Sequence, residues 1–462
     1  MIRTLGIIRT FGIIIALAQI ALQTLTAQQP FSFRVVTTGL GMPWEVVWGP
    51  DDQLWITERT ARRVIRVNPS TGAVTPLLNV TDSYDPGESW HEGVLGLALH
   101  PDLLKNLGRD YVYVAYTYDA DPGPQLLRKL KVRRYTYETA KSTLVDPIDI
   151  ITNVPAHDDH GAGRVAFGPD QKLYVTRGDN GGNWLANYCM PNRSQDLPTA
   201  AEVAAKDWST YVGKILRLNL DGSIPADNPT INGVRSHIYT YGHRNPQGLG
   251  FGPTGLLYSS EHGPGTDDEL NLIVPGSNYG WPHIAGYRDD RGYVYANWSQ
   301  SKDVPCASLK FEEYLEQIPP SVPRQKESEW KNPFVPPLRT FFTVPADYDF
   351  QKSGGATIAA GGLEIYSARD GISGWANSVL QTGMTMGRVY RVKLSEDGRS
   401  AVGENEELFR SANRYRDIAI GRDARTFYLV TDNNGLGRTT DPSGARVTTF
   451  ANPGSVLELK RN

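Results

Sequence analysis

Two polar, glycine-rich segments flank one expected β-hairpin and carry groups that can bind an oxygen-rich ligand. Residues 242–248 read GHRNPQG, and residues 261–269 read EHGPGTDDE. The stretch 249–260 between them reads as strand, turn and strand, so both segments lie at the same end of the hairpin. Arg244 and Asn245 in the first segment offer a guanidinium and a carboxamide to ligand oxygens. The alternative is a pair of ordinary turns.

The second segment has the pattern expected of a site for a hard cation. Gly263 and Pro264 are followed by acidic residues. Such a loop can direct backbone carbonyls at calcium, which prefers oxygen ligands. Together the two segments predict a site for a polar ligand and a calcium ion.

His160 lies beside carboxylates, which is the arrangement that a general base needs. The segment 157–160 reads HDDH and precedes an expected strand, and Asp179 lies at the far end of the next strand. Histidine titrates near neutral pH, and a neighbouring carboxylate can orient it for proton transfer. The alternative is a histidine that only satisfies the hydrogen bonds of a turn.

Arg414 and Arg416 lie two residues apart, just before an expected strand. Side chains alternate along an extended chain, so these two guanidiniums point the same way. Two cations directed at one place repel each other unless an anion or a polyoxygenated ligand lies between them. The pair therefore indicates an anion site, with a solvated charged strand as the alternative.

A short phrase recurs along the chain and shows what positions these residues. It consists of an aromatic or aliphatic residue, Gly-Pro or a similar pair, a polar turn and an apolar strand, and a second strand follows. One blade of a few strands cannot bury both faces, so such repeats must stack around an axis. We expect an all-β fold, a six-bladed β-propeller with loop insertions. The six copies lie at residues 48–57, 97–116, 167–176, 251–259, 362–366 and 420–431.

The last strand and two insertions complete the expected propeller. The strand at 455–459 is expected to pair with the first blade and so close the ring. Residues 184–212 contain an expected helix, 199–206, with Thr199 as its N-cap. Residues 299–338 are rich in proline. Both insertions read as surface elaborations that wall a funnel or meet another subunit, and neither reads as a separate domain.

Composition and the N-terminus limit the classes of function. Lys and Arg (47) nearly balance Asp and Glu (50), so no basic surface predicts nucleic-acid binding. Residues 1–27 read as a secretory signal peptide cleaved after Ala27. Its apolar core is shorter than the roughly 20 residues of a membrane span. We therefore expect a periplasmic or secreted chain, 28–462, with no membrane span. Cys189 and Cys306 are the only cysteines, and they can pair only if the fold brings them together.

The chain resembles the soluble glucose and aldose dehydrogenases that depend on pyrroloquinoline quinone (PQQ). The resemblance spans essentially the whole mature chain, and the fold of that family is a six-bladed propeller. It implies PQQ and calcium as cofactors and an aldose sugar as substrate. The resemblance is compatible with a homodimer, and it does not identify the natural electron acceptor. The phrases that carry it lie at residues 168–172, 213–225, 242–248, 278–282, 326–330, 413–417 and 452–455.

The resemblance also implies a role for each candidate residue. His160 takes the proton of the anomeric hydroxyl as hydride passes to the quinone, Asp179 orients it, and Asp159 lies beside the substrate. Arg244 and Asn245 hold oxygens of the quinone, and Arg414 and Arg416 hold cofactor carboxylates. The carbonyls of Gly263 and Pro264 bind the calcium of the cofactor. The further calcium ligands that it implies are Glu269, Tyr279, Ala285, Tyr287, Asp289 and Glu327.

Four departures from the family pattern leave cofactor affinity and sugar preference open. Where the family has a glutamine against the cofactor, this chain has His91. Where the family has a lysine that binds the cofactor, this chain has Thr385. Where the family has a glutamine on the substrate side, this chain has Trp184. The loop that covers the sugar is shortened to residues 351–355.

We therefore expect a periplasmic quinoprotein that oxidises aldoses at the anomeric carbon to lactones, by hydride transfer to PQQ. Two alternatives stay open. One is a calcium-dependent propeller lactonase, and the other is a sugar-binding propeller that has lost its cofactor, which Thr385 favours.

Overall fold

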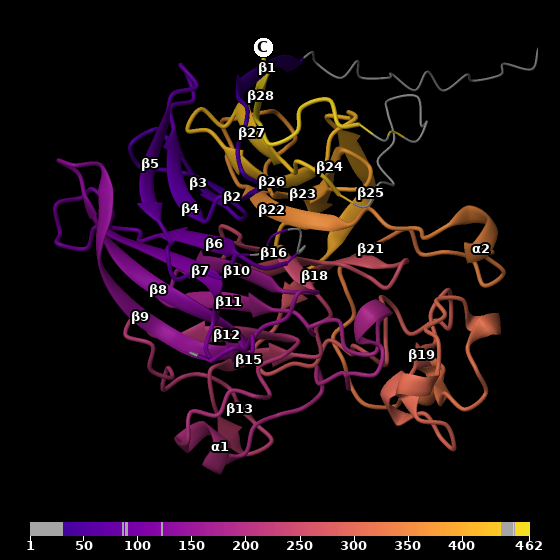
Figure 1. Cartoon of the computed structure of the whole chain (residues 1–462). Helices are drawn as coiled ribbons and strands as arrows, with labels where there is room; N and C mark the ends of the chain where they lie inside the picture. The colour runs from indigo at the N-terminus through magenta and orange to yellow at the C-terminus, as the bar shows by residue number, and fades with distance from the viewer. Residues whose placement is uncertain (1–30, 86, 88–90, 122, 436–446, 448) are drawn as a thin grey trace, which may run out of the picture.

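The computed structural model describes residues 31–85, 87, 91–121, 123–435, 447 and 449–462 (Figure 1). Six four-stranded antiparallel sheets make up the six blades of a β-propeller, as the repeats predict. The expected signal peptide, 1–27, lies outside the described residues. Neither helix within the described ranges has the length and apolar composition that a membrane crossing requires.

The first three blades follow one another along the chain, and each is a simple meander. Their strands are β2 (Pro43–Trp48), β3 (Leu54–Glu58), β4 (Arg63–Val67) and β5 (Val74–Asn79); β6 (Val94–Leu99), β7 (Tyr111–Asp119), β8 (Arg128–Glu138) and β9 (Thr143–Pro155); and β10 (Ala162–Phe167), β11 (Leu173–Arg177), β12 (Lys214–Leu218) and β15 (Ile238–Tyr241).

The last three blades complete the ring, and the sixth contains both ends of the described chain. Their strands are β16 (Pro246–Phe251), β17 (Leu257–Glu261), β18 (Asp268–Ile273) and β21 (Arg339–Phe341); β22 (Ala360–Tyr366), β23 (Ser378–Gly383), β24 (Arg388–Leu394) and β25 (Ala401–Leu408); and β26 (Tyr415–Ile420), β27 (Thr426–Thr431), β28 (Val456–Arg461) and β1 (Phe31–Thr37).

The first strands of the blades form an inner ring around the axis. β2, β6, β10, β16, β22 and β26 each contact the next in this order, and β26 contacts β2. The second strands pack between neighbouring blades. β3 and β11 are therefore buried along their whole length, in keeping with their apolar sequences.

The ring closes at the sixth blade and not at the first. β28 pairs with β27 and with the N-terminal strand β1, from Phe31 opposite Arg461 to Thr37 opposite Val456. The expectation that the last strand pairs with the first blade is wrong in this detail, because β2–β5 already form a complete blade. β1 precedes the first repeat, so closure places both chain ends in one sheet.

The insertions contain the remaining elements, and the part around β19 and α2 projects to one side of the blades (Figure 1). The predicted helix is confirmed. Thr199 caps it, its hydroxyl accepting from the Glu202 N–H while the Glu202 side chain accepts from the Thr199 N–H. The elements are α1 (Ala200–Ala204), α2 (Phe350–Ser353), β13 (Thr230–Ile231), β14 (Val234–Arg235), β19 (Tyr295–Ala296), β20 (Arg324–Gln325), and short 3₁₀ turns at 185–187, 298–300, 306–308, 315–317 and 327–329.

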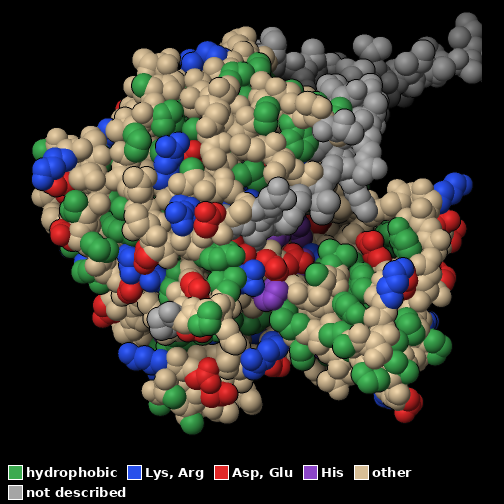
Figure 2. All heavy atoms as spheres, viewed as in Figure 1, with side chains coloured by type: hydrophobic (Ala, Val, Ile, Leu, Met, Phe, Trp, Pro, Cys, Tyr) green, Lys and Arg blue, Asp and Glu red, His purple; other side chains and the backbone are tan. Residues whose placement is uncertain are grey.

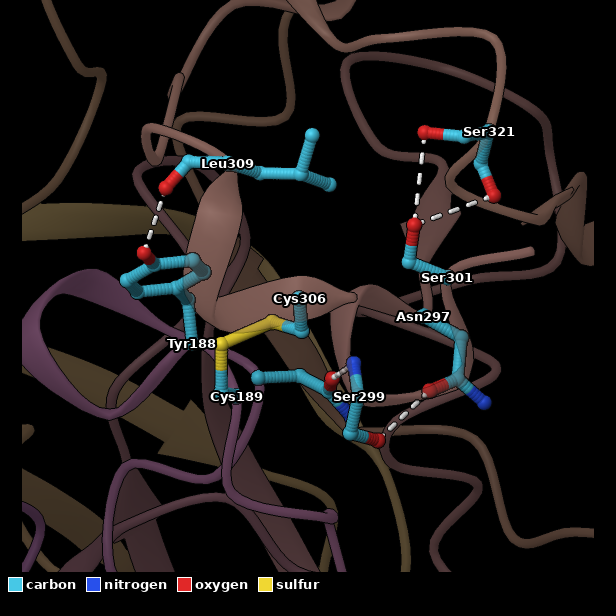
Figure 3. Close-up of a disulfide and its surroundings, with 9 residues drawn as sticks. Tyr188, Cys189, Asn297, Ser299, Ser301, Cys306, Leu309 and Ser321 are labelled. Atoms are coloured by element: carbon cyan, nitrogen blue, oxygen red, sulfur yellow. Dashed lines mark hydrogen bonds between the residues drawn. A yellow bond between two sulfur atoms is a disulfide. The ribbon is translucent and has the colours of Figure 1, made fainter. Parts of the chain in front are cut away.

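A disulfide joins the two insertions that the sequence singles out. Cys189 and Cys306 are bonded, with their Cα atoms 5.6 Å apart across a sequence separation of 117 residues (Figure 3). Tyr188 beside this bond donates its hydroxyl to the Leu309 carbonyl at 2.6 Å. The question that the sequence leaves open, whether these cysteines pair, is settled by the fold.

Candidate active site

The candidate catalytic and cofactor-binding residues gather at one end of the propeller, called here the mouth. Each lies in a segment that enters the first strand of a blade or in one that follows a second strand. Strands alternate in direction within a blade, so both kinds of segment open at the same end. Figure 2 shows histidine side chains with acidic and basic ones around them in a hollow near the centre of that view.

His160 and Asp179 meet at the mouth, where His160 precedes β10 and Asp179 follows β11 of the third blade. The two side chains are buried, and His160 Nδ1 lies 2.6 Å from Asp179 Oδ1. A carboxylate only accepts, so Nδ1 carries the proton of this hydrogen bond. The other ring nitrogen, Nε2, therefore keeps its lone pair and can accept a proton.

Asp179 is held from several directions by neutral donors. Its Oδ2 accepts from the Trp281 indole N–H at 2.6 Å and from the Asn192 carboxamide at 2.9 Å. The backbone N–H of Gly181 donates to Oδ1 at 2.9 Å. His160, Asp179, Trp281 and Asn192 are called the histidine side of the mouth.

Asp159 and His91 border the histidine side. Asp159 Oδ1 lies 3.7 Å from Nε2 of His160 and 3.5 Å from Nε2 of His91. Burial alone would raise the pKa of Asp159, but His160, His91 and Arg244 lower it to about 2. Burial lowers the pKa of His91 to about 3, so its imidazole is neutral at pH 7.

Arg244 and Asn245 enter β16 and lie against the histidine side. The Arg244 carbonyl accepts from the Asp179 N–H at 2.8 Å. The guanidinium carbon lies 5.4 Å from the Trp184 ring centre and 5.3 Å from that of Trp281. Within the described part of the chain, Nε of Arg244 and Nδ2 of Asn245 are buried N–H donors with no hydrogen-bond partner. Leaving such a donor unsatisfied costs about 1–3 kcal/mol, which indicates a ligand at this place.

Arg414 and Arg416 point the same way, as the alternation predicts, and both are buried. The alternative of a solvated strand is therefore wrong. The anion between them is a side chain of this protein, Asp432, which accepts from Arg414 Nε at 3.2 Å and from Arg416 Nη2 at 2.8 Å. The Arg416 guanidinium also packs 4.3 Å from the centre of the Trp44 ring. Arg414, Arg416 and Asp432 are called the arginine side.

The single carboxylate of Asp432 contacts two guanidiniums, and a third cation, Arg59, lies close by. Arg59 follows β3 at the mouth, where burial and the positive charge of Arg416 lower its pKa to about 10. Its Nη1 donates to the Glu92 carbonyl at 3.2 Å. This side of the mouth is therefore positively charged.

Thr385 follows β23 and is buried beside the arginine side. Its hydroxyl donates to the Thr357 carbonyl at 2.9 Å. The sulfur of Met384, the preceding residue, lies 3.7 Å from Arg414 Nη2. Thr385 thus lies close to Arg414 but contributes no charge.

Gly263 and Pro264 follow β17 and line a small cavity of about 10 Å³. That volume is close to the space needed by one water molecule or ion. The Glu261 carboxylate accepts from the Arg244 backbone N–H and from His243. Burial and the nearby Glu261 raise the pKa of Glu269 well above its usual range. Of the six further predicted calcium ligands, three also line this cavity: Glu269, Tyr279 and Ala285.

The remaining predicted calcium ligands lie at Glu327. Its carboxylate is buried and accepts from the backbone N–H groups of Ala285 at 2.9 Å and Asp289 at 3.2 Å. Tyr287 between them is 38% exposed. Among the described residues, no three side chains of His, Cys, Asp or Glu are grouped as a metal site.

Several residues of the mouth lie outside the sequence predictions. Asp432 follows the second strand of its blade, as Asp179 and Arg59 do, so its position in the repeat is a usable signal. Trp281 lies within the phrase 278–282 that carries the resemblance, but its bond to Asp179 spans more than a hundred residues. Asn192 is part of an insertion, and no signal in the sequence indicates it.

Comparisons with known proteins agree with this geometry. The sequence pattern of the family described as glucose/sorbosone dehydrogenase matches residues 40–321 and 344–438. The chain is 41% identical over 442 residues to quinoprotein glucose dehydrogenase B of Acinetobacter calcoaceticus, over 93% of this chain and 91% of that protein. It is 27% identical over 292 residues to the aldose sugar dehydrogenase YliI of Escherichia coli, over 60% of this chain and 71% of that one.

The fold is also shared with solved structures. The PQQ-bound form of aldose sugar dehydrogenase from Streptomyces coelicolor aligns with a TM-score of 0.62 and 26% identity, over 94% of this chain and 98% of that chain. These matches extend over the blades that build both sides of the mouth.

Proposed function

Because the chain belongs to the glucose/sorbosone dehydrogenase family, we propose that it is an exported quinoprotein that oxidises aldoses at the anomeric carbon to lactones. The family makes it a sugar oxidoreductase. The observation that carries the finer proposal is the His160–Asp179 pair lying against buried, unpartnered N–H donors of Arg244 and Asn245. A base for the substrate thus lies beside donors for a cofactor.

His160 performs the proton transfer in this proposal. Nδ1 is held by Asp179, so Nε2 faces the substrate as the acceptor of the anomeric hydroxyl proton. As the imidazole gains charge, the Asp179 carboxylate stabilises it. The neutral donors Trp281 and Asn192 keep that carboxylate in place. A base in such a position contributes about 10²–10⁴ in rate.

The residues of the mouth fit PQQ, which has quinone oxygens and three carboxylates and supplies the hydride acceptor when bound. Arg244 and Asn245 would hold quinone oxygens, since Nε of Arg244 and Nδ2 of Asn245 lack partners in the described chain. Arg414 and Arg416, which share a single carboxylate, would hold cofactor carboxylates. His91 and Thr385 would border it as neutral groups.

Calcium fits the small cavity at Gly263 and Pro264. Backbone carbonyls and the carboxylates of Glu261 and Glu269 line it, and oxygen donors of this kind suit a hard cation. Arg244 lines the same cavity, and its guanidinium together with a cation there would stabilise negative charge on a quinone oxygen. One preorganised donor of this type is worth roughly 3–4 kcal/mol. A second, structural calcium at Ala285, Tyr287, Asp289 and Glu327 is part of the proposal.

Export to the periplasm or the medium is supported by two features. The N-terminal sequence has the order of a secretory signal peptide. The Cys189–Cys306 bond belongs to the class of cross-link that persists in oxidising compartments.

Reconstitution tests the proposed function. The protein is purified without cofactor, calcium and PQQ are added separately and together, and dye reduction is followed with a panel of aldoses. We expect turnover only with both present. No turnover with any aldose at saturating PQQ and calcium would refute it. Lactone hydrolysis with calcium alone would favour the lactonase, and sugar binding without PQQ binding would favour a sugar-binding propeller.

A further inference from the structure

A buried arginine lies directly behind the proton-transferring pair, and the proposed reaction gives it no role. Arg177 is the last residue of β11, two positions before Asp179, and its side chain is fully buried. It forms no ion pair with a carboxylate of the described chain. Burial lowers the pKa of Arg177 to about 9, so the guanidinium is still a cation at pH 7. A cation buried without an anion is costly unless its N–H groups are hydrogen-bonded, so its acceptors indicate what it does.

Two of the acceptors of Arg177 belong to the two halves of the base–carboxylate pair. Nη1 donates to the carbonyl of Gly161, which follows His160 directly. Nη2 donates to Oδ1 of Asn180, which follows Asp179 directly, at 3.1 Å. One guanidinium thus joins the segment that carries the base to the segment that carries its carboxylate.

Arg177 is itself held in a fixed place. Nη2 also donates to the carbonyl of Pro155, at the end of β9 in the second blade, at 2.6 Å. Within the third blade Arg177 pairs opposite Ala162 of β10, and the register slips by one residue between Ala162 and Val165. A β-bulge of this kind re-aims neighbouring side chains and is common beside active sites. The guanidinium therefore acts from a rigid position between two blades.

The backbone next to these hydrogen bonds lies in the left-handed region. φ is +43° at His160 and +48° at Ala162, the two neighbours of Gly161, and +59° at Asn180. Asparagine tolerates this region better than histidine or alanine, so the strain is larger on the side of the base. Such residues persist only where surrounding contacts hold them, and Arg177 supplies one contact to each segment.

We propose that Arg177 is a positioning residue, which holds His160 and Asp179 in the relative orientation that proton transfer needs. The inference rests on the proposed function, in which His160 is the base. Nδ1 of His160 lies 2.6 Å from Oδ1 of Asp179, and a displacement of about 1 Å at such a site costs about 10²-fold in rate. Among the described hydrogen bonds of Arg177, none goes to either side chain. Its effect therefore passes through the backbone that follows each of them.

Arg177→Met separates positioning from stability. Methionine fills similar space but removes the charge and the donors. The Tm of the cofactor-free protein should stay within about 4 °C of wild type, because relief of an unpaired buried charge opposes the loss of the hydrogen bonds. The kcat of the loaded enzyme with an aldose should fall about 10- to 100-fold, with KM and the Kd for PQQ within about twofold. A large fall in Tm together with an equal loss of PQQ binding would show a structural role and overturn the inference.

The Nδ1 proton of His160 gives a direct readout of the pair in cofactor-free protein labelled with ¹⁵N-histidine. A short bond to the Asp179 carboxylate moves this proton far downfield and protects it from exchange, and its absence in His160→Gln assigns it. We expect the resonance in the wild type and its loss in Arg177→Met. Arg177→Lys, which keeps the charge and one set of donors, should restore part of the resonance and part of kcat. A variant series in which neither quantity changes would overturn the inference.

Arg134→Met is the matched control. Arg134 on β8 also forms no ion pair with a described residue. It packs 4.2 Å from the centre of the Tyr111 ring, at the end of the second blade away from the mouth. This variant should leave kcat and the resonance near wild type.

If Arg177→Met fails to fold, Asn180→Gly supplies the test, since glycine suits the φ of +59° and only the acceptor is lost. It should lower kcat about two- to tenfold, the value of one hydrogen bond, and shift the resonance. An unchanged kcat and an unchanged resonance would overturn the inference.

The inference and the proposed function fail separately. If the wild type oxidises glucose and Arg177→Met keeps both its kcat and its resonance, the inference is overturned and the function stands. If no aldose is oxidised, the function is refuted, and loss of the resonance in Arg177→Met still supports a positioning role for Arg177.

Discussion

The two sides of the mouth place a buried aspartate at the same position of a blade and use it differently. Asp179 follows the second strand of the third blade, and Asp432 follows the second strand of the sixth. Asp179 contacts an imidazole, an indole and a carboxamide. Asp432 contacts two guanidiniums. The repeat thus determines where a carboxylate stands, and its neighbours determine the chemistry.

This difference separates proton transfer from anion binding. Asp179 contacts His160, so its carboxylate can stabilise the positive charge that the imidazole gains with a proton. Asp432 faces permanent cations. Burial would raise the pKa of Asp432, but Arg416 and Arg414 hold it below its usual range, so it stays ionised. Even so, one carboxylate leaves the arginine side with excess positive charge.

The largest expected effect is on the histidine side. His160→Ala should lower kcat by about 10²–10⁴ and leave PQQ reconstitution nearly unchanged, because the base acts on the substrate proton in the transition state. Single-turnover kinetics and a PQQ titration measure the two quantities. His157→Ala, in the same segment, is the control and should stay near wild type. If His160→Ala failed to bind PQQ, the histidine side as well as the arginine side would bind the cofactor, and the proposed division between them would be wrong.

The next effect is on the arginine side. Asp432→Asn removes the carboxylate that two buried guanidiniums share and should lower the free energy of unfolding of the cofactor-free protein by about 3–5 kcal/mol. Adding PQQ and calcium should recover more stability than in the wild type, as shown by thermal unfolding with and without the ligands. Asp227→Asn is the control, since its exposed pairing with Arg217 is worth about 1 kcal/mol or less. Equal ligand stabilisation in both proteins would contradict an anion site here.

A smaller effect is expected when charge is added to the arginine side. Thr385→Lys should tighten PQQ binding by about ten- to a hundredfold, since a charge-assisted hydrogen bond is worth about 1.5–3 kcal/mol. The gain should shrink as salt is raised. His91 is neutral, so it does not already supply this charge. Thr385→Val controls for the lost bond to Thr357, and an unchanged Kd in Thr385→Lys would place residue 385 away from the cofactor.

The smallest expected effect concerns His91, which borders both sides. Its pKa is lowered to about 3 in the folded protein, so between pH 6.5 and 3 the unfolded chain binds a proton that the folded chain does not. Stability from neutral His91 is therefore present above pH 6.5 and is lost as the pH falls. His91→Gln should flatten the fall in Tm between pH 6.5 and 4, measured by calorimetry. Parallel Tm curves would mean that His91 is charged at the mouth.

Much of the fold follows from local patterns in the sequence. Alternating strands after polar turns predict six blades, and Thr199 with Glu202 marks the start of the helix that the structure contains. The hairpin 249–260 places its two polar segments at one end because the strands pair antiparallel, Pro246 opposite Glu261. The sequence predicts the wrong partner for the closing strand, because strand pairing across about 400 residues leaves no local pattern.

The candidate site divides in the same way. Spacing alone predicts that His160 pairs with Asp179 and Arg414 with Arg416. The first two residues flank successive strands of one blade, and the second two alternate along one strand. Asp432, Trp281 and Asn192 join those pairs through contacts between distant segments, which hydrophobic periodicity does not encode. The neutral state of His91 depends on burial and on nearby cations, and these exist only once six blades surround it.

The sequence by itself determined the repeat, the polar segments that end its strands, and the residue types that can transfer a proton or bind an anion. The tertiary structure decided which of these groups meet. It paired Cys189 with Cys306, gave the two arginines an internal carboxylate, and enclosed an aromatic cavity lined by Trp184 and Trp281. The physical reason is range: turns and strands arise from neighbours in the chain, whereas charge pairing, desolvation and cavities arise where the ring of blades brings distant segments together.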